Sequence, residues 1–391
     1  MTSQEDAGPG RRPRLVTPVF VVVLVSTLAY FMSVGLLLPV LPRYIEGPLG
    51  GTDVAVGISI GAFSIVAVIL RPLAGRAGDR RGRRPLIVGG ALIVAASVAC
   101  YSLVHSLASL LVFRCTAGAG EAMFFTGSAS IITDIAPEER RGEAVSIFSL
   151  ALYGGLSLGP ILGETIFGHH RYHAVWWTAA AFGLLAALAG LAVRTPAIDH
   201  PADVEPAPIV HPAAVLPGLV LASVIWGFSA FSAFVTLYAL KLGLGGSRYV
   251  FFTYSFTVLL IRFFGARLPD VLGARRAATI ATAAAAGGMV IMGAWGSPSG
   301  LYAGSFLLGI GGAFAFPAGL TLALHDVPAS QRGAVVGTFT AFFDLSYGIG
   351  AVSLGAVAHA LGYRGTFAMS AVVAAAGLVL LRTKVHERQG A

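Results

Sequence analysis

The chain has 391 residues, of which 56% are hydrophobic and only 11% are charged, and its mean hydropathy is +0.81. Soluble domains carry about 25% charged residues, so this composition excludes a water-soluble enzyme and indicates a protein that lies mostly in lipid. The net charge is +8, but the basic residues fall between apolar segments, which is typical of membrane topology and not of nucleic-acid binding. The two cysteines, Cys100 and Cys115, lack metal-ligand spacing.

Apolar segments long enough to cross a bilayer follow one another along the whole chain, since a spanning helix needs about 20 mostly apolar residues. The first is too long for a signal-peptide core of about 7–15 residues, so we expect it to be retained. The sequence therefore predicts an all-α integral membrane protein with twelve transmembrane helices, at residues 17–42, 54–74, 86–104, 108–132, 143–165, 173–193, 213–240, 249–268, 276–295, 299–323, 333–358 and 364–382.

The basic residues predict the orientation of these helices. Nineteen of the 26 fall before the first helix, after the last or in alternate loops, among them the segment 71–84, and five fall in the opposite loops. Cytoplasmic loops carry an excess of arginine and lysine, so both termini are predicted to be cytoplasmic. Arg114 and Arg262 remain, and both lie within predicted helices.

A linker divides the chain into two halves. Residues 195–212 hold five of the twenty prolines and read as an extended connector. We expect an N-terminal six-helix bundle at residues 1–194 and a C-terminal six-helix bundle at residues 213–391.

The halves share landmarks at a nearly constant offset, which indicates an internal duplication. Parallel six-helix repeats place a transport site between the halves, near the middle of the bilayer. The matching pairs, 191 or 192 residues apart, are Asp79 with Asp270, Gly82 with Gly273, Asp134 with Asp326, Arg141 with Arg332 and Gly159 with Gly350.

Several motifs carry a resemblance to a known family. Residues 75–85 (GRAGDRRGRRP), between the second and third helices, resemble the signature loop of the major facilitator superfamily. Residues 114–122 (RCTAGAGEA) are similar to its arginine-bearing motif in helix 4, and residues 155–163 (GLSLGPILG) to the antiporter motif in helix 5. Residues 39–44 (PVLPRY) and 342–348 (FFDLSYG) are similar to segments of its drug:proton antiporters and arabinose-efflux-like exporters.

This resemblance covers the whole chain and implies a fold of two pseudo-symmetric six-helix bundles. The chain departs from the pattern at Glu164, where the helix 5 motif usually has a second glycine, and at residues 265–270, where the second-half loop is degenerate.

The signature loop predicts a cytoplasmic gate. Gly75 and Gly82 permit tight turning, Asp79 can accept bonds from arginines, and we expect Asp134 to pair with Arg80 or Arg83. The alternative is that the arginines only mark the cytoplasmic side. The resemblance implies that the gate consists of Gly75, Asp79, Arg80, Gly82, Arg83, Arg84, Asp134 and Arg141.

Three charged residues within helices are candidates for proton coupling or substrate binding. Arg114 and Glu121, seven residues apart, return to nearly the same helix face about 10 Å apart. An intramembrane carboxylate is functional by default, so Glu121 is expected to face the interior and carry a proton. Asp344 is the other deep carboxylate and is expected to carry the proton or bind a cationic group of the substrate. The alternatives are a static ion-pair network and an internal hydrogen bond to a hydroxyl group.

Glycines and aromatic residues suggest a hinge and a cavity. Gly155, Gly159 and Gly163 form a small-residue face with Pro160, which serves either a packed hinge or packing alone. Glu164, near the outer end of helix 5, is expected to be an ordinary exposed carboxylate. Aromatic residues that could line a cavity, or instead face lipid and neighbouring helices, are Tyr30, Phe31, Trp226, Phe231, Phe234 and Tyr347.

No cofactor or metal is expected. A GxxxxGK[ST] loop is absent from the sequence, and His169, His170 and His173 are expected to form a polar outer loop and not a metal site.

The sequence thus predicts a proton-coupled exporter, an antiporter that moves a small molecule, drug or metabolite by alternating access. We expect a monomer in the bacterial inner membrane whose partners are its substrate, protons and lipid. The alternatives are a sugar or metabolite facilitator, an uptake symporter or a lipid-handling carrier. A transport-inactive sensor or a membrane enzyme is a remote alternative.

Overall fold

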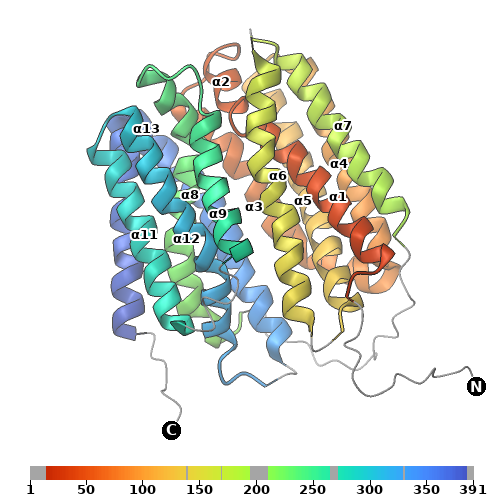
Figure 1. Cartoon of the computed structure of the whole chain (residues 1–391). Coiled ribbons are helices and arrows are strands. Elements are labelled where there is room, and N and C mark those ends of the chain that lie inside the picture. The colour runs from red at the N-terminus through yellow and green to blue at the C-terminus, as the bar shows by residue number, and fades with distance from the viewer. Residues whose placement is uncertain are drawn as a thin grey trace, which may run out of the picture.

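The computed structural model describes residues 15–137, 140–168, 170–193, 210–264, 272–328 and 331–384, without the side chains of residues 141, 142 and 333. Two bundles of helices stand side by side (Figure 1). The first contains α1 (Pro18–Leu37), the short α2 (Leu41–Glu46), α3 (Asp53–Arg81), α4 (Arg83–Ala99), the 3₁₀ helix η1 (Cys100–Leu103), α5 (Leu107–Ile135), α6 (Arg141–Phe167) and α7 (Tyr172–Leu191). The second contains α8 (Pro212–Lys241), α9 (Arg248–Phe264), α11 (Ala274–Ala294), α12 (Pro298–Leu324) and α13 (Arg332–Lys384).

The helices supply the predicted twelve crossings. In the described part of the chain, ten helical segments are long and apolar enough to span a bilayer. The described part of α9 adds 17 residues, and α13 is two helices that meet at Gly362, whose φ of 69° and ψ of 179° are not helical. The prediction of twelve helices in two six-helix bundles is therefore confirmed. Most of the predicted linker, residues 194–209, lies outside the described residues.

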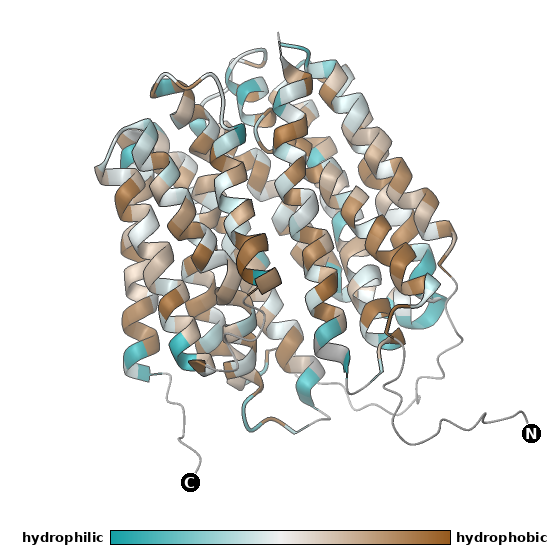
Figure 2. Ribbon diagram, viewed as in Figure 1, coloured by the Kyte–Doolittle hydropathy of each residue, from teal (hydrophilic) through white to brown (hydrophobic). Residues whose placement is uncertain are grey.

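The bundle has two ends, which we name by their elements. The α2 face contains α2, the connection from α6 to α7 and the start of α9, and the termini face contains the start of α1 and the end of α13 (Figure 1). Apolar residues cover the middle of the helices, and hydrophilic residues gather at helix ends on the termini face (Figure 2). This distribution suits helices whose middle portions lie in hydrocarbon.

The glycine face of α6 packs within the first half. A Cβ atom on Gly159 would lie 2.6 Å from the Cα atom of Gly35 in α1, and one on Gly155 would lie 2.6 Å from the Cβ atom of Phe31. Because only glycine permits this approach, the backbones of α1 and α6 lie in close contact. The helix continues through Pro160 to Phe167.

The most extensive contacts between the halves join α3 with α13 and α6 with α9, and α2 and α3 also contact α8. The first pair is tight because small residues line it: a Cβ atom on Gly61 would lie 2.8 Å from the carbonyl oxygen of Gly348. The central charged residues lie along these two seams.

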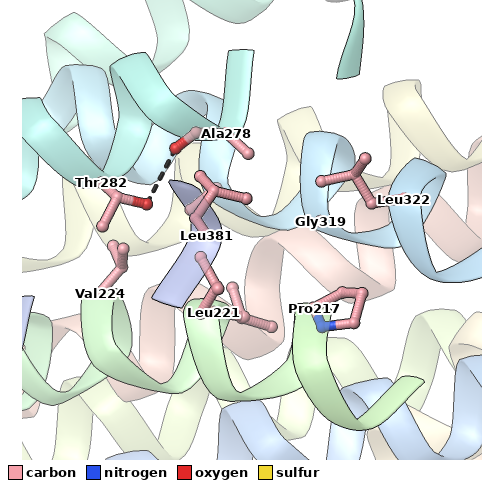
Figure 3. A pocket seen from close by; sticks show the side chains of 10 residues that line it. Pro217, Leu221, Val224, Ala278, Thr282, Gly319, Leu322 and Leu381 are labelled. Carbon is pink, nitrogen blue, oxygen red and sulfur yellow. Dashed lines mark hydrogen bonds between the residues drawn. The ribbon is translucent and has the colours of Figure 1, made fainter. Parts of the chain in front are cut away.

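A small pocket lies inside the second half, between α8, α11, α12 and α13 (Figure 3). Its lining is apolar except for Thr282, whose hydroxyl group donates to the carbonyl oxygen of Ala278 at 2.8 Å. It contains no group that could bind an ion, so it belongs to the packing of this half.

Candidate functional site

One arginine joins two carboxylates at the centre of the molecule. Arg71 in α3 forms an ion pair with Asp344 in α13, and its Nη2 atom lies 3.9 Å from Oε1 of Glu121 in α5. Its guanidinium carbon also lies 4.6 Å from the centroid of the Phe125 ring. Two carboxylates, one from each half, therefore share a single cation.

The expectation that Arg71 is one of the cytoplasmic loop residues was wrong, because it lies within α3. The predicted second span stops at residue 74, whereas α3 continues to Arg81, so that Arg71 lies ten residues before its end. The predicted span, residues 54–74, already contained Arg71, but this arginine was counted with the arginine-rich segment that follows the apolar residues.

Glu121 is held in place by a tyrosine. The hydroxyl group of Tyr30 in α1 donates to Oε2 of Glu121 at 2.5 Å, and the Tyr30 ring stacks on Phe124 with centroids 3.8 Å apart. Phe31, which is also nearly buried, packs edge-on against Tyr30. These contacts fix the carboxylate so that its second oxygen faces Arg71.

Arg114 has its own partners in the first half. Its Nε atom donates to the carbonyl oxygen of Ser59 at 2.9 Å, and its guanidinium carbon lies 4.5 Å from the centroid of the Phe63 ring. Among the described residues no ion pair joins it to Glu121, although both lie on α5. Its side chain therefore fastens α5 to α3.

The aromatic residues predicted to line a cavity separate into two groups. Tyr347 lies one helical turn from Asp344, and its hydroxyl group is 2.9 Å from the Ser232 hydroxyl group. Trp226 has a buried indole nitrogen without a hydrogen-bond partner among the described residues. Phe231 and Phe234 are fully buried within the second half, where they pack against Phe251 and Tyr363, so a cavity-lining role for these two stays a prediction.

A second charged cluster lies on the termini face. Arg83 at the start of α4 pairs with Asp79 at 2.7 Å and with Asp134 at the end of α5 at 3.2 Å. Gly82, with φ of 83°, makes the turn between α3 and α4. Gly75 lies inside α3, so the turn expected there was wrong. The cluster ties three helices of the first half together.

The other predicted gate residues contribute less to this cluster. Arg80 and Arg84 are exposed, and the side chain of Arg141 lies outside the described residues.

Glu164 is buried between the halves at the α2 face. Its carboxylate accepts bonds from the backbone amides of Ser247 and Arg248, each at 2.7 Å, and from the Ser247 hydroxyl group at 2.8 Å. Arg43 forms an ion pair with it at 2.8 Å. The expectation of an ordinary exposed carboxylate was wrong, because its partners are distant in sequence and belong to another helix. Glu164 of the first half thus caps the start of α9 in the second.

No group of three or more His, Cys, Asp or Glu residues in the described segments could hold a metal ion. Of the histidine loop, His169 lies outside those segments, and the His170 ring packs on Phe167.

Comparison with known proteins identifies the family. The model of the Major Facilitator Superfamily matches residues 23–251 and 247–390. The chain belongs to this superfamily. A relative described as an uncharacterized MFS-type transporter of Burkholderia mallei (strain SAVP1) is 31% identical over 409 residues, covering 98% of this chain and 96% of the relative. Another MFS-type transporter, from Salmonella typhimurium, is 26% identical and covers 91% of this chain and 94% of its own length.

Solved structures share the fold. A bacterial homologue of the human lysosomal transporter Spinster, in an inward-facing and unoccupied conformation, has a TM-score of 0.73 at 15% identity and covers 96% of both chains. The human organic anion transporter MFSD10 has a TM-score of 0.71 at 21% identity, covering 95% of this chain and 100% of its own. The protein is therefore a multi-pass membrane transporter of the major facilitator fold, and not an enzyme.

Proposed function

We propose that the protein is a proton-coupled exporter, an antiporter that moves a small molecule across the bacterial inner membrane by alternating access. The observation that carries this proposal is the shared arginine, since Arg71 is paired with Asp344 of the other half and lies near Glu121 of its own. Arg71 pairs with one carboxylate and lies near a second, so a proton that binds to either carboxylate changes the net charge of this cluster.

Protonation of Asp344 would change the contact between the halves. A charged Asp344 attracts Arg71 and holds α13 against α3, and a neutral Asp344 leaves Arg71 to Glu121 alone. Because ion pairs gain strength in surroundings of low dielectric constant, the loss of one charge weakens the seam substantially. A proton that moves inward supplies about 2.3 kcal/mol per 100 mV of membrane potential and about 1.4 kcal/mol per pH unit. This energy suffices to drive export against a gradient.

We propose that the termini face is cytoplasmic and that the structure is closed on the opposite side. Support for the orientation comes from the basic residues near the termini face, which follow the positive-inside rule. Support for the closed side comes from Glu164, and from the Tyr363 hydroxyl group of α13, which donates to Glu46 of α2 at 3.1 Å. Both contacts join the two halves at the α2 face.

The other predicted roles remain proposals. We propose that Arg83, with Asp79 and Asp134, forms the cytoplasmic gate and that the protein works as a monomer. The domain boundaries proposed are residues 1–194, 195–212 and 213–391.

The test is proton release from protein in liposomes upon addition of a trial substrate. A panel of cationic drugs, sugars and amino-acid-like metabolites is added to wild type, Glu121→Gln and Asp344→Asn. The control is Glu143→Gln. Glu143 also forms an ion pair with an arginine, Arg140, but its side chain is 51% exposed and lies at the start of α6, away from the central charges. We expect release from wild type and the control and its loss in Asp344→Asn. A substrate that moves equally well without a pH gradient in all four proteins would contradict proton coupling and indicate a facilitator.

A further inference from the structure

Arg262 stands in the second half where Arg71 stands in the first. The two arginines are 191 residues apart, and so are Tyr153 and Asp344, which matches the offset of the internal repeat. In the first half, Arg71 of α3 pairs with Asp344 of α13. In the second, the guanidinium carbon of Arg262 in α9 lies 4.3 Å from the centroid of the Tyr153 ring in α6. Equivalent positions between the halves thus hold an ion pair on one seam and a cation–π contact on the other.

Arg262 has no acidic partner among the described residues. No carboxylate of that part of the chain forms an ion pair with it, and its buried Nε atom has no hydrogen-bond partner there. An aromatic ring attracts a guanidinium group but does not balance its charge. Because an uncompensated charge within the bilayer is costly, such residues are retained where they serve a substrate or an ion.

The centre as a whole is short of negative charge. Three guanidinium groups, of Arg71, Arg114 and Arg262, accompany only the two carboxylates Glu121 and Asp344 in the described middle portions of the helices. One anionic group bound at Arg262 would complete the balance.

We propose that Arg262 is the anion-recognition residue of the substrate site and that the transported substrate carries a carboxylate group. The inference rests on the proposed function and deepens it by naming the substrate class. A guanidinium group offers paired N–H donors in a planar fork that matches the two oxygens of a carboxylate. The Tyr153 ring lies 4.3 Å from the guanidinium carbon, and a contact with the ring does not use the paired N–H donors of the fork. The substrate carboxylate then supplies to Arg262 the negative charge that Asp344 supplies to Arg71 on the other seam.

The first test is calorimetric binding to the full chain in nanodiscs, without any gradient. The probes are benzoate, phenylacetate and hexanoate, each compared with its primary amide. We expect at least one carboxylate to bind wild type more tightly than its amide, and Arg262→Gln to weaken that binding roughly tenfold or more. Arg262→Lys keeps the positive charge but loses the paired N–H donors, so its affinity for the carboxylate should lie between those of wild type and Arg262→Gln.

The matched control is Arg248→Gln. Arg248 lies at the other end of α9 and also contacts a ring, with its guanidinium carbon 4.8 Å from the centroid of Tyr249. We expect carboxylate binding to be unchanged in this variant. Unchanged affinity in Arg262→Gln, an equal loss in Arg248→Gln, or no carboxylate preferred over its amide would each overturn the proposal.

A second test uses wild type alone and therefore does not depend on the folding of a variant. Phenylglyoxal modifies accessible arginines, and mass spectrometry of the peptides measures the extent at each position. The bound carboxylate should slow the modification of Arg262 severalfold and leave the modification of Arg248 unchanged. Equal protection of Arg262 by the amide would contradict a carboxylate site at this residue. Because neither test uses a proton gradient, carboxylate binding without proton release would contradict the proposed coupling and leave this inference intact.

Discussion

Arg71 and Arg262 occupy equivalent positions in the two halves, yet within the described segments only Arg71 of the two is paired with a carboxylate. The internal repeat therefore has an arginine at both contacts between the halves, but a carboxylate partner at the contact of α3 with α13 alone among the described residues. In the mechanism that we propose, this difference makes a site on an approximate two-fold axis directional, since the proton binds on one seam and the anionic group on the other.

Exchange of the central charges tests the pair between Arg71 and Asp344. Arg71→Gln leaves two carboxylates without a cation, and we expect transport in proteoliposomes to fall by at least tenfold, because breaking a buried pair costs about 3–5 kcal/mol. The double variant Arg71→Asp with Asp344→Arg restores opposite charges across the same seam and should recover part of the rate. Wild-type transport by Arg71→Gln would rule out a functional role for the pair.

Removal of the Glu164 charge should loosen the α2 face. Hydrogen bonds to charged groups contribute about 1.5–3 kcal/mol each, so Glu164→Gln should raise the open-to-closed ratio roughly tenfold. The distance between spin labels at His105→Cys and Ser299→Cys can be measured once Cys100 and Cys115 have been replaced. In Glu164→Gln we expect a second, longer distance, which belongs to the open state. In the control Glu143→Gln, the distribution of label distances should match that of wild type. If the distribution in Glu164→Gln also matches wild type, the bonds of Glu164 do not hold the α2 face closed.

The glycine face of α6 should tolerate no side chain. In Gly159→Ala the new Cβ atom would lie 2.6 Å from the Cα atom of Gly35, and overpacking of this kind costs about 1–3 kcal/mol. Gly75→Ala is the control, because nothing lies within 4 Å of a Cβ atom there and alanine is the better helix former. Thermal unfolding in detergent should show a lower midpoint for Gly159→Ala only. Equal midpoints would mean that α1 and α6 can move apart at little cost.

Neighbouring arginines on the termini face should differ in importance. Arg83 is 9% exposed and bonds to Asp79 and Asp134, whereas Arg84 is exposed. We expect Arg83→Gln to lower the free energy of unfolding by about 1–3 kcal/mol, as for other hydrogen bonds to charged groups, and Arg84→Gln to have little effect. Chemical denaturation of both variants would reveal the difference, and unchanged stability in both would leave the two arginines a role in topology alone.

The fold was predictable because its signals are local. Hydropathy located twelve crossings, and the constant offset divided them into two halves. The same signals made Glu121 and Asp344 candidates, since a carboxylate in an apolar segment is conspicuous.

What could not be predicted depends on contacts between distant segments. The pairing of Arg71 requires Asp344, which is 273 residues away, and the burial of Glu164 requires Ser247 and Arg248, which are 83 and 84 residues away. One usable signal was overlooked: Arg262 follows Arg71 by the repeat offset of 191, which already placed both in equivalent positions within the membrane.

Hydrogen–deuterium exchange can follow the cap that Glu164 forms on α9. The amide groups of Ser247 and Arg248 donate to a carboxylate of the opposite half, and Gly246 leaves room for it, since a Cβ atom there would lie 2.5 Å from Oε2 of Glu164. When the halves part on this side, these two amides lose their acceptor and meet water. Their hydrogen–deuterium exchange therefore records how often the unlabelled, unmodified transporter opens toward that side.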